Sequence, residues 1–472
     1  MLNFNPQLII PELYMVALLA ILFVQSISQR LKDKIIWVPF AALLGAVLAG
    51  FSTTGPEFMF YESYKIDGLS QFFKTIIFLG LAVCAGNALR VNSLGPANRA
   101  DYFFFMFMSA FGLLLLASTV ELFTIYISLE LASFCLYIML PFRNKDPRAV
   151  EASVKYILFG AVATAVGLYG ISYILAGMHT TYVNELLTMD WSFAEQPMAL
   201  IGLALFLMAF AYKLALFPLH FWAPDVMQGA SNETATFAAT LPKLGAIVIL
   251  VRLMGFDPGI ELKVFLGVFA ALSMTIGNLA ALNQTDVKRL LGYSSVSHAG
   301  FVIVGLVAGG AYGLAAASYY ALVYMVMNLT IFWVITRISQ EGKNVYLDDL
   351  RGLYSRSPVL ALVLAVSAFA LVGLPPTAGF IGKVFLFGAA WDAGFFWLVI
   401  IGVINSALAI FYYLNLVRYA YTMEPEVPSK ISLTPAGAII AVILALGVIY
   451  LGVLPQDIFD FLMQSSTMFL SF

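Results

Sequence analysis

The chain has 472 residues, of which 62% are hydrophobic and 11% charged, with a formal net charge of -2. A soluble domain is about half apolar and about a quarter charged, so this composition and a mean hydropathy of +0.93 exclude a protein dissolved in water. The near-neutral charge, without a long basic run, gives no basis for a nucleic-acid partner. Cys84 and Cys135 lie in apolar runs without the spacing that binds zinc or an iron-sulfur cluster, and we interpret them as packing residues.

Apolar runs follow one another along most of the chain. About 20 apolar residues make one membrane-spanning helix, and such runs lie near residues 8–27, 35–52, 71–90, 102–119, 121–140, 154–177, 198–221, 233–254, 261–282, 290–309, 312–336, 358–390, 394–419 and 434–454. Backbone inside lipid must satisfy its own hydrogen bonds, and the alternating pattern of a barrel is absent. The sequence therefore predicts an all-α polytopic membrane protein of about 14 transmembrane helices. No Lys or Arg precedes the first run, unlike in a cleavable signal peptide, so we expect this helix to be retained.

The distribution of Lys and Arg between alternate loops predicts the orientation. Of the 24 basic residues, seventeen fall in one set of loops: Arg30, Lys32, Lys34, Arg90, Arg99, Arg143, Lys145, Arg148, Lys155, Lys288, Arg289, Arg337, Lys343, Arg351, Arg356, Arg418 and Lys430. The other set holds Lys65, Lys74, Arg252 and Lys263. We therefore expect the first set in the cytoplasm and both termini on the non-cytoplasmic side.

Two of the expected helices are interrupted by proline. The seventh contains Pro218, and the long twelfth contains Pro375 and Pro376, each of which removes a helix donor at membrane depth. Breaks at corresponding places of helices 4–8 and 9–13 predict two inverted five-helix repeats with a transport site between them. A pair of ordinary proline kinks is the simpler alternative. The predicted organisation is three N-terminal helices (1–100), a first repeat (101–256), a second repeat (257–420) and helix 14 with a tail (421–472).

Four charged residues are expected at membrane depth. Glu130 lies near the middle of helix 5, Lys213 and Lys243 lie within helices 7 and 8, and Lys383 follows the break in helix 12. A charge at the bilayer centre costs on the order of 2.5–3.5 kcal/mol on insertion scales, so each needs a partner or a wet cavity. Desolvation disfavours the charged form of a side chain, whereas a Glu–Lys pair favours it. Making or breaking one pair can thus load or unload a proton on a lysine, which predicts a proton relay. A static Glu130–Lys213 salt bridge is the alternative, but it leaves Lys243 and Lys383 without acidic partners.

The histidines add weaker candidates. His298 lies in the middle of helix 10 among serines, where it could pass protons between Lys243 and Lys383, although a buried histidine is more often a hydrogen-bonded packing residue. His220 beside the break in helix 7 is a weaker relay candidate, and His179 is expected in a loop. The three have no metal-ligand spacing. Phosphate-loop and dinucleotide motifs are also absent, so any redox chemistry that drives this chain is expected elsewhere. The many aromatic side chains are interpreted as packing or lipid-facing, not as a quinone site.

Several motifs resemble the antiporter-like subunits of respiratory complex I. They are Ser128-Leu-Glu130-Leu-Ala-Ser-Phe, Glu151-Ala-Ser-Val-Lys155-Tyr, Lys213-Leu-Ala-Leu-Phe-Pro-Leu-His220-Phe-Trp222-Ala-Pro-Asp225 and Asp286-Val-Lys288-Arg-Leu-Leu-Gly-Tyr-Ser-Ser-Val-Ser-His298. The likeness extends over most of the chain. Within the family, Gly379-Phe-Ile-Gly-Lys383 and the lack of a long extension after helix 14 favour the branch that has no lateral helix and has lysine at position 383.

The resemblance implies a membrane-arm subunit that translocates protons. In such a subunit Glu130 pairs with Lys213, Lys243 is the central relay lysine, Lys383 lies on the exit side, and His298 is part of the central hydrophilic axis. Glu151 and Lys155 are implied as secondary polar sites. NADH, FMN, iron-sulfur clusters and quinone would be bound by partner subunits, namely other membrane-arm subunits and, indirectly, the peripheral redox arm.

Two other functions remain open from the sequence. A subunit of a multisubunit sodium/proton antiporter would use the same fold and similar lysines without any redox partner. A structural scaffold for other pumping subunits would retain its lysines only for packing.

Overall fold

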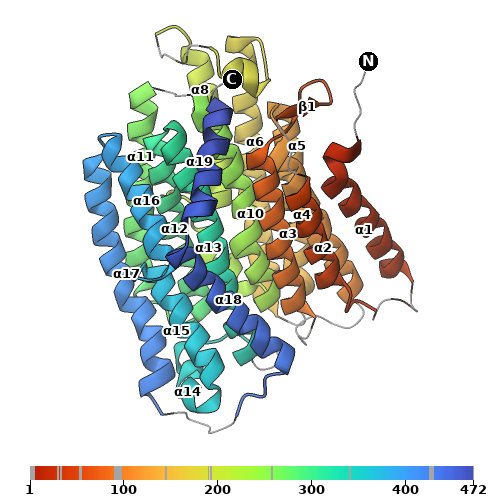
Figure 1. The fold of residues 1–472 in the computed structure, drawn as a ribbon, viewed down its shortest axis with the longest axis vertical. Coiled ribbons are helices and arrows are strands. Elements are labelled where there is room, and N and C mark those ends of the chain that lie inside the picture. The colour runs from red at the N-terminus through yellow and green to blue at the C-terminus, as the bar shows by residue number, and fades with distance from the viewer. Residues whose placement is uncertain are drawn as a thin grey trace.

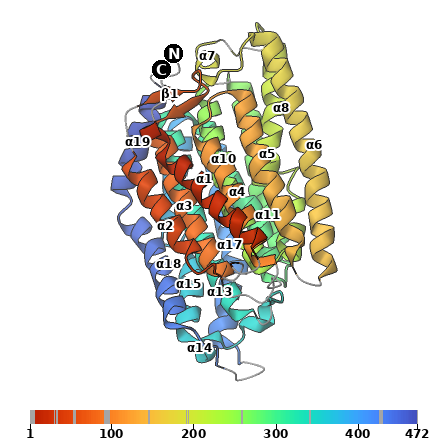
Figure 2. The ribbon, with the colours of Figure 1, turned by 90° about the vertical axis from the view of Figure 1, so that its right-hand side faces the viewer.

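The computed structural model describes residues 6–28, 31, 34–52, 56–89, 98–143, 146–189, 191, 194–256, 259–339, 342–424 and 430–470. Long helices run side by side in one bundle, and a two-stranded hairpin lies at one end of it (Figures 1 and 2). Four members of the predicted basic set, Arg30, Lys32, Arg90 and Lys145, lie outside the described residues.

Nearly all described elements are helical. The elements in chain order are η1 (Pro6–Ile9), α1 (Ile10–Ile27), α2 (Val38–Phe51), β1 (Glu57–Met59), β2 (Tyr64–Ile66), α3 (Gly68–Ala88), α4 (Arg99–Ser118), α5 (Leu122–Met139), η3 (Leu140–Phe142), α6 (Pro147–Met178), α7 (Val183–Leu186), α8 (Pro197–Leu214), α9 (Trp222–Gly229), α10 (Asn232–Leu253), η4 (Met254–Phe256), α11 (Gly259–Ala281), α12 (Val287–Ala308), α13 (Gly310–Ile338), η5 (Leu347–Leu350), α14 (Leu353–Arg356), α15 (Pro358–Val372), α16 (Ala378–Asp392), α17 (Phe396–Thr422), α18 (Pro435–Val453) and α19 (Gln456–Leu470).

The predicted all-α membrane bundle is confirmed. Within the described residues, 12 helical segments are long and apolar enough to cross a membrane, and α2 and α15 are shorter apolar helices. A total of fourteen crossings requires α2 and the α15–α16 pair to be counted as well, and it stays a prediction. Helix α10 is almost entirely enclosed: all its residues except Pro242 are buried, and it packs against α3, α4, α5, α8, α9, α12 and α13. Charged residues on α10 therefore lie inside the bundle.

Both expected helix interruptions are present. Helix α8 ends at Leu214 and α9 begins at Trp222, with Pro218 between them; α15 ends at Val372 and α16 begins at Ala378, with Pro375 and Pro376 between them. The chain leaves α8 through Ala215 and α15 through Gly373, at φ of 61° and 89°. A left-handed residue directly after a helix is a common way for it to stop. The interruptions are thus complete ends of half-helices and not bends in continuous ones.

Two short backbone bridges mark corresponding places in the two predicted repeats. Glu121 pairs with Tyr182, and Asp286 pairs with Tyr346. Each bridge has the same two hydrogen bonds between neighbouring residues. In the first, Leu122 N–H donates to the Thr181 carbonyl and Val183 N–H to the Val120 carbonyl. In the second, Val287 N–H donates to the Val345 carbonyl and Leu347 N–H to the Thr285 carbonyl. Both acids also cap the helix that follows them, α5 and α12 respectively. This correspondence supports the predicted repeat; the proposed boundaries at 100, 256 and 420 remain predictions.

Buried ion pairs close the end of the bundle that carries the hairpin. Arg252, at the end of α10, donates to both carboxylate oxygens of Asp67 at 3.0 and 2.9 Å. Lys74 of α3 lies 2.6 Å from Glu12 of α1, which also accepts a hydrogen bond from Tyr64. Burial raises the pKa of Asp67, but the Arg252 guanidinium outweighs this effect and holds the pKa below its ordinary value.

These contacts correct one expectation from the sequence. Lys65, Lys74 and Arg252 were assigned to solvent-facing loops, but their side chains are buried. The count of loop charges places these three residues wrongly, because it does not consider that a charged side chain can be buried in the bundle with a partner. The end of the bundle that carries the hairpin therefore exposes even less positive charge than the sequence suggests.

Replacing Arg252 with Met should destabilise the protein by about 3–5 kcal/mol, because the Asp67 carboxylate is then left buried without its cation. The measurement is the thermal unfolding midpoint of the purified protein in detergent. The matched control combines Arg252→Met with Asp67→Asn, which removes the unpaired charge and keeps an N-cap side chain for α3. The double variant should unfold at a higher temperature than Arg252→Met alone; equal midpoints would show that the ion pair is not what Arg252 supplies.

Candidate functional site

The three lysines and one histidine that the sequence placed at membrane depth are all buried. Lys213, Lys243, Lys383 and His298 are exposed by 3, 2, 4 and 3% respectively. They lie on α8, α10, α16 and α12, and Glu130 lies on α5 with an intermediate exposure. The bundle therefore encloses four basic side chains in its apolar interior, where each must find a substitute for water.

Glu130 and Lys213 interact electrostatically but do not touch. The Lys213 ammonium donates instead to the Ser133 hydroxyl at 2.5 Å and to the Tyr137 hydroxyl at 3.5 Å. Glu130 Oε1 is buried without a hydrogen-bond partner. Among the described residues, no ion pair within 4.0 Å joins the two side chains. The structure thus shows the pair in an open state, in which Ser133 lies one helical turn beyond Glu130.

Aromatic rings surround the Lys213 ammonium on its remaining sides. Its nitrogen lies 5.4, 5.6 and 5.7 Å from the ring centres of Tyr137, Tyr156 and Tyr212. The indole of Trp222, at the start of α9, packs against the last two of these rings. An aromatic face attracts a cation, most strongly where water is excluded. The open position of Lys213 is therefore a built pocket with its own stabilising contacts.

Lys243 and His298 belong to a second polar group in the centre of the bundle. The Lys243 ammonium donates to the backbone carbonyl of Ser295 at 3.3 Å and lies 5.4 Å from the centre of the Tyr324 ring. Ser295 and His298 are three residues apart on α12, and the His298 ring also packs against Tyr324. Electrostatic interactions connect His298 to both Lys243 and Lys383. The histidine is therefore close enough to both lysines to interact with them, and its relay role stays a prediction.

The two nitrogens of His298 are held by tyrosines from different helices. Nδ1 lies 2.8 Å from the Tyr320 hydroxyl and Nε2 lies 3.3 Å from the Tyr413 hydroxyl. Tyr413 is also hydrogen-bonded to Ser294. A neutral imidazole donates from one nitrogen and accepts at the other, so a tyrosine at each end allows either tautomer. This arrangement suits a group that gains a proton on one side and loses it on the other.

Lys383 lies across the break between α15 and α16. Its ammonium donates to the carbonyl of Val372, the last residue of α15, at 2.8 Å, and lies 4.4 Å from the centre of the Phe301 ring. Phe301 is three residues beyond His298 on α12. Lys213 is likewise in the last turn of its half-helix, α8. Because a helix carries partial negative charge at its C-terminus, each break supplies a partial counter-charge to one lysine.

The secondary residues occupy a more exposed polar surface. Lys155 lies 2.8 Å from both Glu151 and Asp225, and Asp225 also accepts from Arg289 at 2.6 Å. Together they border a pocket of about 220 Å³ that joins α6, α9 and α12. His220 lies in the helix break, where its Nδ1 is buried without a hydrogen-bond partner. Within the described part of the chain, none of these residues forms a hydrogen bond or ion pair with a buried lysine of the relay, so their own relay role stays a prediction.

Sequence reasoning missed the neutral groups that hold the charged ones. Ser133, Tyr320 and Tyr413 bind Lys213 or His298 directly, yet nothing in one sequence distinguishes the two tyrosines from other packing residues. Ser133 alone offered a signal, because a polar residue three positions after Glu130 falls on the same face of a helix. Within the described part of the chain, no cluster of three or more His, Cys, Asp or Glu side chains could hold a metal ion.

An α-helical membrane bundle with two interrupted helices and a row of buried lysines defines a class of membrane-embedded ion-translocating subunits. Residues 119–409 match the family described as NADH:quinone oxidoreductase/Mrp antiporter, transmembrane. The chain belongs to this family.

Several proteins of the family are similar to this chain over almost its whole length. The chain is 53% identical to NADH-quinone oxidoreductase subunit N 2 of Solidesulfovibrio magneticus, over 97% of this chain and 98% of that one. It is 40% identical to the protein of the same name from Opitutus terrae, over 97% of each chain. A chain of the solved respiratory complex I of Thermus thermophilus is 32% identical, with a TM-score of 0.80 over 94% of this chain and 98% of that one. A chain of the Mrp complex of Dietzia sp. has a TM-score of 0.87 over 99% of each chain but is 21% identical, which shows the shared fold alone.

Replacing Ser133 with Ala should move the Lys213 ammonium toward Glu130. The lysine loses its acceptor at 2.5 Å, and the Glu130 carboxylate becomes the strongest remaining attraction for it. A cryo-electron microscopy structure of the assembled variant should show the two charged groups within the ion-pair distance of about 4 Å.

The matched control for this change is Ser133→Thr, which keeps the hydroxyl and should leave Lys213 among the tyrosine rings. A Ser133→Ala structure in which Lys213 has not moved would show that the rings alone determine its position.

Proposed function

We propose that this chain is the proton-translocating subunit N of a bacterial NADH:quinone oxidoreductase, with Glu130, Lys213, Lys243, His298 and Lys383 as its proton-transfer residues. The similarity to subunit N proteins supports the assignment to this complex. The observation that carries the mechanism is the row of three buried lysines, none of which has an ion-pair partner within 4.0 Å among the described residues. A lysine held only by neutral groups can lose its proton without leaving an orphaned carboxylate behind.

The open Glu130–Lys213 pair is the proposed switch. A conformational or electrostatic change that reaches this subunit from the quinone-reducing partner subunits would move Lys213 between Ser133 and Glu130. Closure of the pair favours the charged lysine, and opening favours the neutral one. The change in charge at Lys213 moves a proton through Lys243, and from there by way of His298 to Lys383. NADH, FMN, iron-sulfur clusters and quinone would be bound by the partner subunits of the membrane and peripheral arms.

The proposed orientation places the face rich in Lys and Arg in the cytoplasm and both termini on the other side of the bacterial inner membrane. Contacts of the described residues support this assignment. Near one terminus, Leu8 and Ile9 pack with Tyr64 and Ile66, and near the other, the Phe469 ring lies 5.2 Å from the Lys65 ammonium. Both ends of the chain are therefore at the same end of the bundle, the end whose cations are buried.

The sodium/proton antiporter alternative receives less support. Its likeness to this chain rests on a fold that the whole family shares, whereas the relatives at 53 and 40% identity carry the name of subunit N. Purification in mild detergent distinguishes the two directly. Redox subunits should co-purify with the chain, and small antiporter subunits in their place would favour the alternative.

Lys213→Ala and Lys243→Ala should each reduce quinone-reductase turnover and proton pumping together, severalfold or more. Each substitution removes a group that must hold the proton within the membrane, so the coupled redox reaction slows with it. The two rates are measured on the assembled complex in proteoliposomes, as NADH oxidation and quenching of a pH-sensitive dye.

Lys430→Ala is the matched control, because this lysine is exposed in the loop before α18. It should assemble and pump as the unmodified complex does. If Lys213→Ala and Lys243→Ala did so as well, the chain would act only as a scaffold and the proposed relay would be wrong.

A further inference from the structure

Helix α10 carries a buried polar stripe that ends at Lys243. Glu233, Thr236, Thr240 and Lys243 are spaced as i, i+3, i+7 and i+10, which places them on one face of the helix. The first three are fully buried and Lys243 is 2% exposed. Glu233 lies in the first turn of α10, roughly 15 Å from Lys243 along the helix axis. The proton-transfer route proposed above uses only the last of these four residues.

The hydroxyl groups of the stripe are hydrogen-bonded but can still accept. Thr236 and Thr240 each donate at 2.7 Å to the carbonyl four residues earlier. Thr236 also accepts at 3.3 Å from Asn87 of α3. A hydroxyl oxygen has two lone pairs, so each oxygen can accept from a bridging water while it donates its own hydrogen. Successive groups of the stripe lie about one helical turn apart, 5–6 Å, which one water can bridge.

Glu233 lies among charged groups at the basic end of the bundle. It interacts electrostatically with Lys288 of α12 and with Tyr102 of α4. The Lys288 ammonium is fully buried and donates to the Ala230 carbonyl at 2.5 Å. Arg143 donates at 3.1 Å to that same carbonyl. The nearby positive charges thus stabilise the Glu233 carboxylate, so it can remain ionised between proton transfers.

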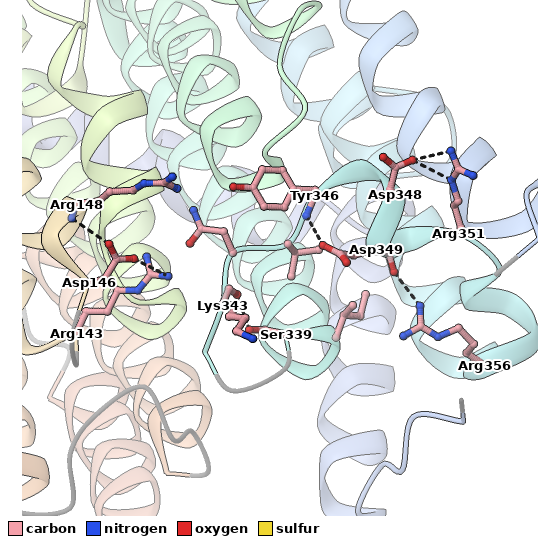
Figure 3. A pocket seen from close by; sticks show the side chains of 13 residues that line it. Arg143, Asp146, Arg148, Ser339, Lys343, Tyr346, Asp348, Asp349, Arg351 and Arg356 are labelled. Atoms are coloured by element: carbon pink, nitrogen blue, oxygen red, sulfur yellow. Dashed lines mark hydrogen bonds and ion pairs between the residues drawn. The ribbon is translucent and has the colours of Figure 1, made fainter. Parts of the chain in front are cut away.

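A polar cavity of about 650 Å³ opens beside this cluster (Figure 3). Arg143, Asp146 and Arg148 line it on one side, and Tyr346, Asp348 and Arg351 on the other. The cavity is joined to the beginning of α10 by Arg143 and by Asn232, whose side chain donates at 3.4 Å to the carbonyl of Lys343, another lining residue. Polar side chains therefore connect the cavity lining to the beginning of α10.

We propose that Glu233 takes up protons from this cavity and delivers them along the α10 stripe to Lys243. In each transfer a hydronium ion in the cavity protonates the Glu233 carboxylate and becomes water. The carboxylic acid then donates its proton toward Thr236. Each threonine hydroxyl turns away from its carbonyl acceptor, donates its own hydrogen through a bridging water to the next group, and accepts the incoming one. The neutral amine of Lys243 accepts the last one and becomes an ammonium, and the Glu233 carboxylate is restored. This inference rests on the proposed role of Lys243 as a relay group.

Packing explains the threonines, and Lys288 offsets the charge of Glu233, but neither accounts for the alignment of these groups with Lys243. Buried threonines in membrane helices commonly donate to a carbonyl of their own helix. A fully buried carboxylate near the helix end, by contrast, costs several kcal/mol in desolvation and adds nothing to apolar packing. Its place on the same face as Lys243, beside a polar cavity, is what a proton uptake route requires.

The test compares Glu233→Gln, Thr240→Val and Thr240→Ser in the assembled complex in proteoliposomes, with Lys243→Ala as the reference. Glu233→Gln keeps the size of the side chain but cannot carry a proton as an acid. Thr240→Val removes only the hydroxyl, and Thr240→Ser retains it. The first two should slow NADH-driven proton translocation severalfold, and Thr240→Ser should restore most of the rate.

Each outcome either supports or overturns the inference. Unmodified translocation in Thr240→Val would overturn it, and this variant decides the matter even if Glu233→Gln fails to assemble. A Thr240→Ser complex as slow as Thr240→Val would assign the loss to packing and also overturn it. In both cases a slow Lys243→Ala complex would leave the proposed function intact. A Lys243→Ala complex that pumps normally would instead remove the proposed function and this route with it.

Discussion

The structure depends on how it holds positive charge in a medium without water. A lysine at the bilayer centre costs on the order of 2.5–3.5 kcal/mol on insertion scales, and the chain contains three such residues. It stabilises them with a hydroxyl, backbone carbonyls and aromatic faces, not with carboxylates at contact distance. Two of the three are placed at the C-terminal end of a half-helix, where free carbonyls and the helix dipole both favour a cation. The proline breaks therefore stabilise the lysine cations as well as redirecting the chain.

The neutral hydrogen-bond partners of the buried lysines allow these lysines to change their protonation state. A buried lysine in contact with a carboxylate is fixed in its charged form, because removal of the proton leaves an uncompensated anion. For a lysine held by Ser133 or by the Val372 carbonyl, the free-energy difference between the charged and neutral forms is smaller than for a lysine paired with a carboxylate. Small movements of a neighbouring charge, such as Glu130, can then decide which form is present. The end of the bundle that carries the hairpin shows the contrast, because Arg252–Asp67 and Lys74–Glu12 are contact pairs suited to fixing helices.

The sequence allowed the all-α fold, the helix breaks and the buried ionisable residues to be predicted, because each is a pattern along one stretch of chain. Glu130, Lys213, Lys243 and Lys383 stand out as charges in apolar runs, and no packing detail is needed to find them. Their partners could not be predicted. Ser133 is 80 residues from Lys213 and Asp67 is 185 residues from Arg252, so both contacts depend on how helices pack. The misplaced Lys65, Lys74 and Arg252 have the same cause.

The placement of α10 connects these observations. It is enclosed by seven other helices, and it has ionisable side chains at its beginning, its middle and its end: Glu233, Lys243 and Arg252. Arg252 is held by the bidentate contact with Asp67, which closes the helix end next to the hairpin. At the other end, Glu233 lies beside cations and near a polar cavity. The proposed uptake route uses this asymmetry, because α10 is closed by an ion pair at one end and borders polar side chains at the other.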